Sequence, residues 1–301
     1  MRTTLLGGLL VVWLSASAFG ADAKPIPIIL DTDIGTDVDD AFALGLILAS
    51  PEFELRAVTT SGGQTEDRAW LACRFITQCG KSGIPVAAGA EPQAKSEVND
   101  QIQYRRHPAA IFNRTLKPVK EPAAEVILAE LKKQPGEITV VAIGPLTNIA
   151  RLLTDHPKSA KLMKGLVIMG GSVFAGYNGK APAEPEWNIK LDVAAAKKVL
   201  ESGIPLTIIP LDATALAKVP PEEQQKLFAA GRPLAWQVAN LLELWNQPVP
   251  TLFDPVAVAS LLRPAEFEFE NLQLTMNDQG LMAVGTGNPN ARVAVSAKQE
   301  N

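Results

Sequence analysis

The segment Ile28–Leu44 places five aspartates where a predicted strand meets a predicted helix. The short apolar run Pro27–Leu30 predicts a buried strand. Asp39–Ala49 predicts a helix, because aspartates in a first turn are favoured by the positive end of the helix dipole. Ligands of open α/β sheets bind where strands end and helices begin. The segment therefore predicts an α/β chain with an acidic site at that edge.

The five aspartates lie within ten residues, which indicates a bound cation. Helix capping and solvated loop charges would explain one or two of them. Five carboxylates this close repel one another unless a positive charge lies among them. Oxygen-only ligands favour calcium or magnesium over zinc. A hard cation is therefore expected here.

The first residues are typical of a secretory signal peptide. Met1-Arg2 precedes the apolar run Leu5–Leu14, and small residues follow it. This run is too short and wrongly flanked for a membrane span. Cleavage is expected within residues 18–23, which leaves residues 24–301 as a single domain in the periplasm or outside the cell. No later stretch is apolar enough to suggest a membrane partner after signal removal.

Net charge and the positions of the cysteines limit the possible binding partners and disulfides. The formal net charge is −4, which argues against a nucleic-acid polymer or an anionic membrane as partner. The two cysteines, Cys73 and Cys79, are six residues apart on one predicted helix, which is a poor disulfide geometry. Both thiols are therefore expected to be unpaired.

Strands and helices are predicted to alternate along the chain. The expected strands are Glu54–Thr60, Pro85–Ala88, Ile138–Ile143, Gly165–Met169 and Leu206–Pro210. The expected helices are Thr65–Cys79, Pro122–Lys133, Asn148–Thr154, Asp192–Ser202, Pro221–Ala230, Pro233–Trp245 and Asp254–Leu262. Alternation of this kind predicts a doubly wound, largely parallel open α/β sheet. Glu266–Thr275, Leu281–Val284 and Ala291–Ser296 predict a C-terminal antiparallel appendix. The polar stretch Glu91–Thr115 is long enough to suggest a functional lid.

Five segments occur in the order that is typical of one enzyme family. They are Asp33…Asp39-Asp40-Ala41, Gly144-Pro145-Leu146-Thr147-Asn148, Met169-Gly170-Gly171, Glu186-Trp187-Asn188 and Asp254-Pro255. In these segments the chain resembles the inosine–uridine-preferring nucleoside hydrolases. The resemblance implies a nucleoside hydrolase-like fold and calcium-dependent hydrolysis of the N-glycosidic bond of ribonucleosides to free base and ribose. Family members are often dimers or tetramers, so the resemblance is compatible with a homo-oligomer.

The resemblance also implies a role for particular residues. The protein ligands of Ca²⁺ would be Asp33, Asp40, Asp254 and the backbone carbonyl of Ile143, with waters and the ribose 2′- and 3′-hydroxyls completing the shell. Asp33 would also be the general base for a water at the ion. The side chains expected to hold ribose hydroxyls are Asp39, Asn178, Glu186 and Asn188. Phe253 would lie against the base.

The chemistry of these residue types agrees with that reaction. Cleavage of an N-glycosidic bond develops an oxocarbenium-like cation on the ribose, which nearby carboxylates stabilise. A carboxylate can also take the proton of a water made more acidic by a metal ion. A ring of Asp, Glu and Asn reads hydroxyls by hydrogen bonds, so deoxyribose should be rejected.

The chain departs from the family pattern at several positions. Phe253 stands where many members have a histidine that protonates the leaving base. An aromatic ring there favours a stacked, protonated base, which predicts better turnover of purine than pyrimidine ribonucleosides. Gly63 stands in place of an asparagine that contacts ribose. His156 is expected only to end a helix, whereas Tyr104 and His107 in the lid are candidates for meeting the base.

Simpler structural roles were expected for several other residues. Asn148 is expected to cap its helix, and Asp254 before Pro255 has the pattern of an N-cap. Asp31 is expected to accept backbone hydrogen bonds and Asp37 to face solvent. Trp70 and Trp236 are expected in the core, whereas Trp187 fits packing and base stacking equally well.

Two other functions remain open on sequence grounds. Asp31-Thr32-Asp33 after a strand resembles the opening of haloacid-dehalogenase-like phosphatases, although Gly35 departs from their motif. A non-catalytic calcium- and ribose-binding homologue is the other alternative, because Phe253 and Gly63 replace residues that active members use.

Overall fold

The computed structural model describes residues 24–298 except 95, 97–98, 102 and 105–115. The expected signal peptide and His107 lie outside the described residues. None of the helices in the described part is long and apolar enough to span a membrane.

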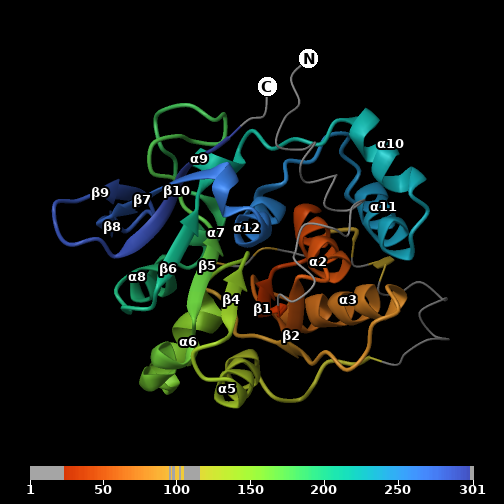
Figure 1. The fold of residues 1–301 in the computed structure, drawn as a ribbon, viewed down its shortest axis with the longest axis horizontal. Helices are drawn as coiled ribbons and strands as arrows, with labels where there is room; N and C mark the ends of the chain where they lie inside the picture. Colours follow the sequence, from red (N-terminus) through yellow and green to blue (C-terminus); the bar gives the residue numbers. More distant parts are fainter. Residues whose placement is uncertain (1–23, 95, 97–98, 102, 105–115, 299–301) are drawn as a thin grey trace.

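An eight-stranded sheet forms the centre of the described chain, as Figure 1 shows. Its spatial order is β3-β2-β1-β4-β5-β6-β10-β7, and all neighbours are parallel except β10 and β7. The strands are β1 (Ile26–Thr32), β2 (Phe53–Thr60), β3 (Val86–Ala88), β4 (Thr139–Ala142), β5 (Gly165–Met169), β6 (Leu206–Ile209), β7 (Phe267–Leu272) and β10 (Ala291–Ala297). The predicted doubly wound, largely parallel sheet is confirmed.

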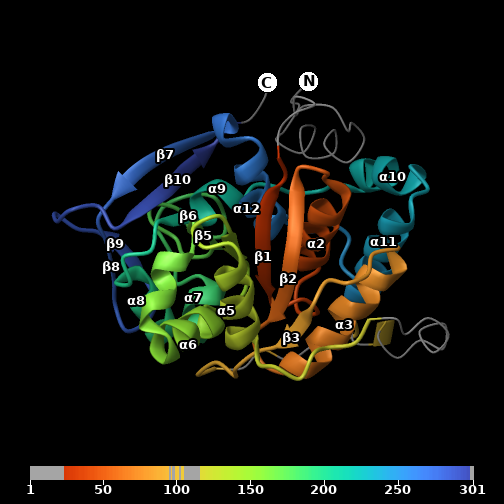
Figure 2. The same cartoon turned by 60° about the horizontal axis from the view of Figure 1, so that its bottom comes forward.

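Helices cover both faces of this sheet and enclose two apolar cores (Figure 2). On one face lie α2 (Asp39–Ala49), α3 (Thr65–Gln78), α11 (Pro233–Trp245) and α12 (Phe253–Leu262). On the other lie α5 (Ala123–Lys133), α6 (Thr147–Asp155) and α8 (Val193–Leu200). The remaining helices are α7 (Trp187–Leu191), α9 (Leu211–Thr214), α10 (Pro221–Ala229), η2 (Pro157–Leu162) and η3 (Pro264–Glu266). Parallel strands buried on both faces explain the continuous apolar runs in the sequence.

The C-terminal strands extend the sheet as predicted, with one refinement. β7 pairs antiparallel with β10, while β10 itself joins β6 in parallel. β8 (Leu274–Met276) and β9 (Met282–Val284) form a separate antiparallel pair. β10 therefore belongs to the main sheet, and the antiparallel addition consists of β7 and the β8–β9 pair.

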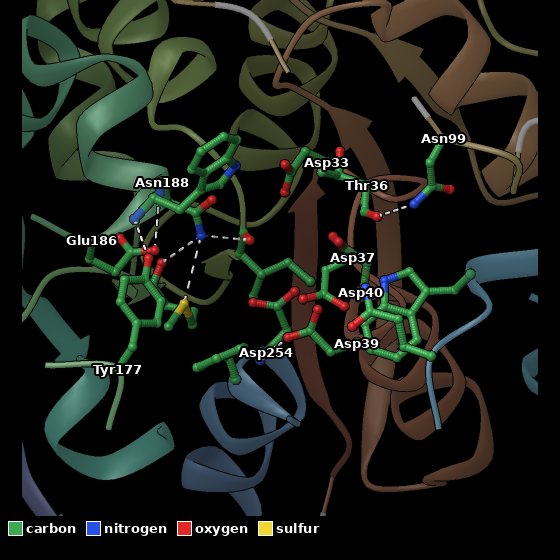
Figure 3. Close-up of a pocket in the computed structure, with 16 residues that line it drawn as sticks. Asp33, Thr36, Asp37, Asp39, Asp40, Asn99, Tyr177, Glu186, Asn188 and Asp254 are labelled. Carbon is green, nitrogen blue, oxygen red and sulfur yellow. Dashed lines mark hydrogen bonds between the residues drawn. The ribbon is translucent and has the colours of Figure 1, made fainter. Parts of the chain in front are cut away.

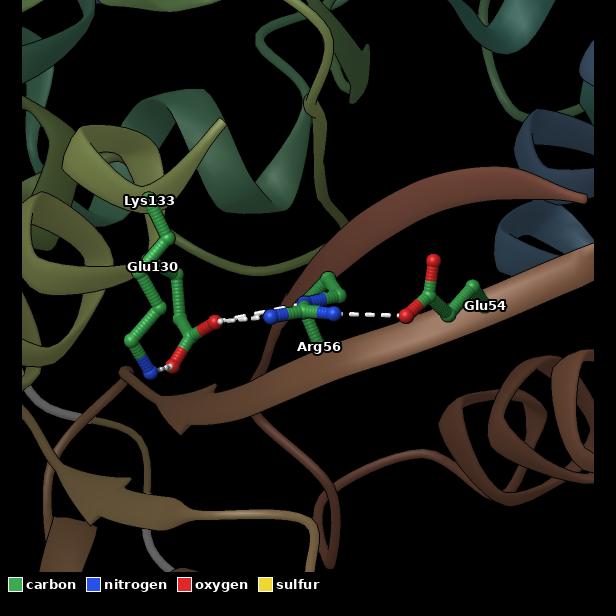
Figure 4. A network of polar contacts seen from close by, with 4 residues as sticks. All are labelled: Glu54, Arg56, Glu130 and Lys133. Atoms are coloured by element: carbon green, nitrogen blue, oxygen red, sulfur yellow. Dashed lines mark hydrogen bonds and ion pairs between the residues drawn. The ribbon is translucent and has the colours of Figure 1, made fainter. Parts of the chain in front are cut away.

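A polar network ties β2 to α5 near the beginning of β2, as Figure 4 shows. Arg56 Nη1 lies 2.5 Å from Glu54 Oε1, and Nη2 lies 3.1 Å from Glu130 Oε2. Lys133 Nζ contacts the other oxygen of Glu130 at 2.5 Å. Glu130 is buried, so these two cations compensate its charge.

Several details differ from the sequence predictions. α12 begins at Phe253 with Leu252 as its N-cap, so Asp254 is not the cap. α7 was not predicted as a separate helix; it begins after Glu186, whose carboxylate accepts from the amides of Asn188 and Ile189. Trp236 is 58% exposed and not in the core, because its side of α11 faces solvent. Trp70 is half-buried.

The sheet order places a topological switch beside β1. β2 and β3 lie on one side of β1, while the chain later returns to its other side as β4. Asp31 is level with Thr59 of β2 and Ala142 of β4. The residues directly after β1 and β4 therefore meet in the crevice where α/β proteins bind ligands.

Candidate active site

A cavity of about 670 Å³ opens at the carboxyl ends of β1, β4 and β5, as Figure 3 shows. Carboxylates line one part of it and aromatic rings another. The acidic residues are Asp33, Asp37, Asp39, Asp40, Glu186 and Asp254, and the aromatic residues are Tyr177, Trp187, Trp245 and Phe253. This combination suits a ligand with a hydroxylated part and a flat apolar part.

Three of the aspartates form a compact cluster. Asp39 and Asp40 open α2, Asp254 lies in the first turn of α12, and one oxygen from each lies within 4.8 Å of the others. All three are buried. Burial, followed by repulsion from neighbouring aspartates, raises the pKa of each carboxyl well above its usual value. Ionised together, they need a cation among them.

Hydrogen bonds hold this cluster in position. The Asp254 amide donates to Asp39 Oδ2 at 3.0 Å, which joins the starts of α2 and α12. The Thr32 hydroxyl donates to Asp40 Oδ1. Carboxylates separated by more than 200 positions in the sequence are thus fixed relative to one another.

Asp33 follows β1 and lies 4% exposed in the wall of the cavity. Burial raises the pKa of Asp33 to about 6, although the positive charge of Arg68 opposes the rise. Two glycines allow its close packing. A Cβ on Gly62, whose φ is +87°, would lie 2.7 Å from the Asp33 Cβ, and one on Gly144 would lie 2.8 Å from Asp33 Oδ1. A carboxyl that titrates near neutrality suits a general base.

Arg68 is a fully buried side chain of α3 that lies beneath this acidic wall. Its Nε donates to the Gly63 carbonyl at 2.7 Å, and Nη1 donates to the carbonyls of Asp33 and Ile34. Nη2 donates to Ser96 Oγ at 3.0 Å. The guanidinium therefore joins three loops and lowers the pKa of Asp33 and Asp40 against the effect of burial. This role has no local signature in the sequence, because an arginine on a helix usually faces solvent.

The donor set fits a hard cation. The cavity lining contains Asp33, Asp40, Asp254 and Ile143, the four expected calcium ligands. The Ile143 carbonyl accepts from Asn188 Nδ2 at 3.0 Å, and a carbonyl oxygen has a second lone pair for an ion. The tightest cluster contains Asp39 in place of Asp33. The structure thus brings all four expected ligands to one place and adds Asp39 as a further carboxylate beside them.

Glu186 and Asn188 line the cavity as expected. Glu186 accepts from the amides of Gly171, Asn188 and Ile189 at 2.9–3.2 Å, and burial raises its pKa to about 7. Asn188 Nδ2 donates to the carbonyls of Ile143 and Met169, which leaves Oδ1 as an acceptor for a hydroxyl. Glu186 is the N-cap of α7, and Asn188 lies in the first turn of the same helix.

Asn178 does not lie in the cavity, so its expected ribose contact is wrong for this structure. It is exposed, and its Oδ1 accepts from the Lys180 amide at 2.8 Å. Its neighbour Tyr177 lines the cavity instead. The loop that carries both residues is turned so that the tyrosine ring faces the cavity.

That loop is anchored at both ends. Asp212 of α9 accepts from the amides of Val173, Phe174 and Ala175 at 2.7–3.1 Å. Ser172 Oγ accepts from the Glu184 amide at 2.9 Å. The first residues of the loop are therefore held by Asp212, a residue outside the loop for which the sequence carried no signal.

The aromatic residues form one side of the cavity. The rings of Phe253 and Tyr177 meet edge to face, with centroids 6.1 Å apart and an interplanar angle of 85°. Trp187 is 46% exposed, so it is not a core residue. Trp245 and Gln247 line the cavity from the end of α11. A nucleobase is the flat group that such a wall accepts.

The described part of the expected lid contacts the loop after β1. The Asn99 amide donates to the Gly35 carbonyl at 3.0 Å, and Asn99 Nδ2 donates to the Thr36 carbonyl at 2.5 Å. Asn99 also lines the cavity, and the sequence did not single it out. Asp37 is only partly exposed and accepts from the Val38 amide at 2.6 Å, so it does not simply face solvent.

Tyr104 and His156 lie away from the cavity. Tyr104 is buried beneath the Arg74 guanidinium, 4.0 Å from its ring centroid, so it does not meet the base. His156 ends α6, as expected, and lies 2.7 Å from Glu125. Cys73 and Cys79 are both free, which confirms the prediction.

Asn148 and Asp31 differ from their expected roles. Leu146, not Asn148, is the N-cap of α6. Asn148 Nδ2 donates to Asp31 Oδ1 at 2.7 Å and to the Thr60 carbonyl at 2.9 Å. Asp31 Oδ1 also accepts from the Thr59 hydroxyl at 2.6 Å, so its partners are side chains and not backbone amides. The two residues brace the ends of β1 and β2 below the cavity.

Comparison with known proteins agrees with this geometry. A family model described as inosine-uridine preferring nucleoside hydrolase matches residues 28–301. The chain belongs to this family. It is a nucleoside hydrolase, an enzyme that cleaves the N-ribosyl bond, and the resemblance seen in the sequence motifs is confirmed.

Curated relatives support the same assignment. The pyrimidine-specific ribonucleoside hydrolase RihA of Citrobacter koseri is 34% identical over 91% of this chain and 95% of its own length. The RihA of an Enterobacter species is 36% identical over 86% of each chain. Among solved structures, the plant nucleoside hydrolase PpNRh1 has a TM-score of 0.76 at 24% identity, covering 91% of this nucleoside hydrolase and 95% of its own chain. A purine-preferring ribonucleoside hydrolase from Gardnerella vaginalis has a TM-score of 0.73 at 25% identity, covering 90% and 93%.

Proposed function

We propose that this nucleoside hydrolase is calcium-dependent and hydrolyses ribonucleosides to free base and ribose, with pyrimidine ribonucleosides as its preferred substrates. The observation that carries the metal requirement is the buried cluster of Asp39, Asp40 and Asp254. Three carboxylates with oxygens this close are unstable together unless one or more is protonated or a cation lies among them. Oxygen ligands and a backbone carbonyl favour Ca²⁺.

Each side chain of the cavity would have a role that follows from its position. When bound, the cation would supply positive charge that acidifies a water and orients the ribose 2′- and 3′-hydroxyls. Asp33 would take the proton of the attacking water. Asp39, Glu186 and Asn188 would hold ribose hydroxyls and, where ionised, stabilise the oxocarbenium-like charge that develops on the sugar. Phe253 would lie against the leaving base.

The pyrimidine preference is supported by the names of the RihA relatives. Those names oppose the purine preference that Phe253 alone predicts. The ring of Phe253 meets Tyr177 edge to face, so its packing already involves a second aromatic residue. The base preference therefore depends on the whole wall formed by Tyr177, Trp187, Trp245 and Phe253.

Two alternatives lose support. The match over residues 28–301 places the chain in a nucleoside hydrolase family and does not favour the haloacid-dehalogenase-like phosphatase. A non-catalytic homologue is disfavoured by the presence of every expected carboxylate in the cavity.

The test is release of base and ribose from a panel of ribonucleosides, with and without a chelator. Purified protein should contain about one Ca²⁺ per chain, and uridine and cytidine should be better substrates than inosine. Asp40→Ala should abolish metal binding and, with it, the release of base and ribose, because the cation that would acidify the water and orient the ribose is lost. Asp278→Ala is the matched control, since this exposed aspartate pairs with Lys197 on the surface. Full activity in chelator would reject the metal requirement.

We also propose that the enzyme is exported to the periplasm or beyond, on the strength of the N-terminal pattern Met1-Arg2 and Leu5–Leu14. Residues 24–301 would then be the mature single domain. A scavenging hydrolase outside the cytoplasm would meet nucleosides before transport.

A further inference from the structure

Tyr177 presents an unused hydrogen-bond donor to the cavity. Its hydroxyl accepts from the Trp187 amide at 2.8 Å. Within the described part of the chain this is the hydroxyl's one hydrogen bond, and a phenol carries one proton to donate. Although Tyr177 is 40% exposed, the partial burial of its hydroxyl and then the charge of nearby Glu186 raise its pKa, so the hydroxyl keeps that proton. Figure 3 shows the hydroxyl turned toward Glu186.

The position of Tyr177 links two parts of the cavity. Its ring edge meets Phe253 on the aromatic side, and its hydroxyl approaches Glu186 on the polar side. The acidic cluster of Asp39, Asp40 and Asp254 lies across the cavity from Tyr177 in the same view. A ligand in the cavity therefore has Tyr177 on one side and the proposed cation on the other.

The stereochemistry of a ribonucleoside matches this arrangement. In a β-ribonucleoside the base and the 5′-hydroxymethyl group project from one face of the ribose, and the 2′- and 3′-hydroxyls project from the other. If the diol lies at the acidic cluster, as the proposed function requires, the base and the 5′-hydroxyl both face Tyr177. The base then meets Phe253, and the remaining hydroxyl of the sugar lies near Tyr177 and Glu186.

We propose that Tyr177 binds the ribose 5′-hydroxyl by donating its phenolic proton, while the Trp187 amide and the Phe253 ring hold the tyrosine in place. This inference rests on the proposed function and gives the role expected of Asn178 to its neighbour. Glu186 can accept the hydrogen of the same 5′-hydroxyl, so donor and acceptor would enclose it. Substrates without a 5′-hydroxyl lose both contacts.

The experiment compares substrates that differ only in this hydroxyl. Steady-state kcat/KM is measured with uridine and 5′-deoxyuridine, and with inosine and 5′-deoxyinosine, for wild type and Tyr177→Phe. Loss of one neutral hydrogen bond should reduce kcat/KM on the 5′-hydroxylated substrate by roughly 3- to 12-fold. The 5′-deoxy substrate should change by less than about 2-fold, because it never made that bond.

Two further variants sharpen the result. Tyr104→Phe makes the same chemical change at the other tyrosine of the chain, which packs under Arg74 outside the cavity, and should show no dependence on the 5′-hydroxyl. Asn178→Ala tests the rival position. Equal losses of Tyr177→Phe on both substrates, or a 5′-dependent loss in Asn178→Ala alone, would overturn the inference.

Failure of the proposed function has a different signature. If wild type releases no base from any substrate, hydrolysis is rejected, and calorimetric binding of uridine and 5′-deoxyuridine to the same variants decides the role of Tyr177. A 5′-dependent loss of affinity in Tyr177→Phe supports the inference, and equal affinities of wild type for both ligands reject it.

Discussion

Replacing Arg68 with methionine should destabilise the protein more than any surface charge substitution. The buried guanidinium donates to the carbonyls of several loop residues and to one hydroxyl. Its partners are Asp33, Ile34, Gly62, Gly63 and Ser96. Methionine fills a similar length but removes the donor of the Asp33, Ile34 and Gly63 carbonyls, whereas the Gly62 carbonyl keeps its bonds from Ser96. Removing one side of a buried charged network costs about 3–5 kcal/mol.

The expected change in melting temperature follows from that free energy. A chain of this size loses about 2–4 °C of Tm per kcal/mol, so Arg68→Met should lower Tm by roughly 6–20 °C. The Tm of Arg68→Lys should lie between those of wild type and Arg68→Met, because an ammonium keeps the charge but cannot make the forked set of hydrogen bonds. Arg151→Met is the matched control. Arg151 is exposed and pairs with Asp155 within one helix, which is worth only about 0.3–0.5 kcal/mol.

Calcium should modulate this loss. Arg68 opposes the rise in pKa of Asp33 and Asp40, as a bound cation would. Calorimetric or fluorescence melting in chelator and in saturating Ca²⁺ should therefore show a smaller difference between wild type and Arg68→Met when calcium is present. A Tm loss no larger than that of Arg151→Met would refute the structural argument. An identical Tm loss in chelator and in saturating Ca²⁺ would refute the idea that Arg68 and a bound cation offset the same carboxylate charges.

Three further predictions concern pH, the leaving group and export. Burial raises the pKa of Asp31 and Glu186 to about 7, whereas in the unfolded chain both ionise near pH 4. Between about pH 4 and 7 the folded state therefore binds more protons than the unfolded state, so the free energy of unfolding that these two groups contribute falls as pH rises. Asp31→Asn removes one of the two groups and should flatten the slope of Tm against pH in metal-free protein. Phe253→Ala should reduce kcat/KM more on uridine or inosine than on a nitrophenyl riboside, whose leaving group needs no protonation; equal losses would mean that Phe253 only packs. Mass spectrometry of exported protein should find a new N-terminus within residues 18–23, and intact Met1 in the cytoplasm would contradict this.

The sheet and the acidic site were predictable because local sequence determines them. Apolar runs set the strands, and α2 begins at Asp39 as its acidic first turn predicted. Asp33, Asp40 and Asp254 were found from motifs, because each belongs to a short segment that the resemblance to the family covers. The assembly of the acidic cluster from α2 and α12, by contrast, depends on contacts between distant parts of the chain.

The remaining parts of the site depend on tertiary contacts. Asn178 and Tyr177 are adjacent, and contacts with other parts of the chain, such as those of Tyr177 with the Trp187 amide and the Phe253 ring, accompany the placement of the tyrosine in the cavity. Arg68 shows no local sign of burial, since its acceptors belong to loops folded elsewhere. Asn99 reaches the cavity only through its bonds to the loop after β1. Asn148 has the pattern of a cap, yet long-range partners hold it below the site.

The anchoring of the loop after β5 bears on how the substrate specificity of such an enzyme can change. Asp212 holds one end of the loop, and the bond between Ser172 and Glu184 closes the other. The intervening positions 176–183 can therefore vary in length and sequence while Glu186 stays in register with the acidic cluster. Selection, or an engineer grafting segments between relatives, can exchange the residue at position 177 without rebuilding the acidic side of the cavity.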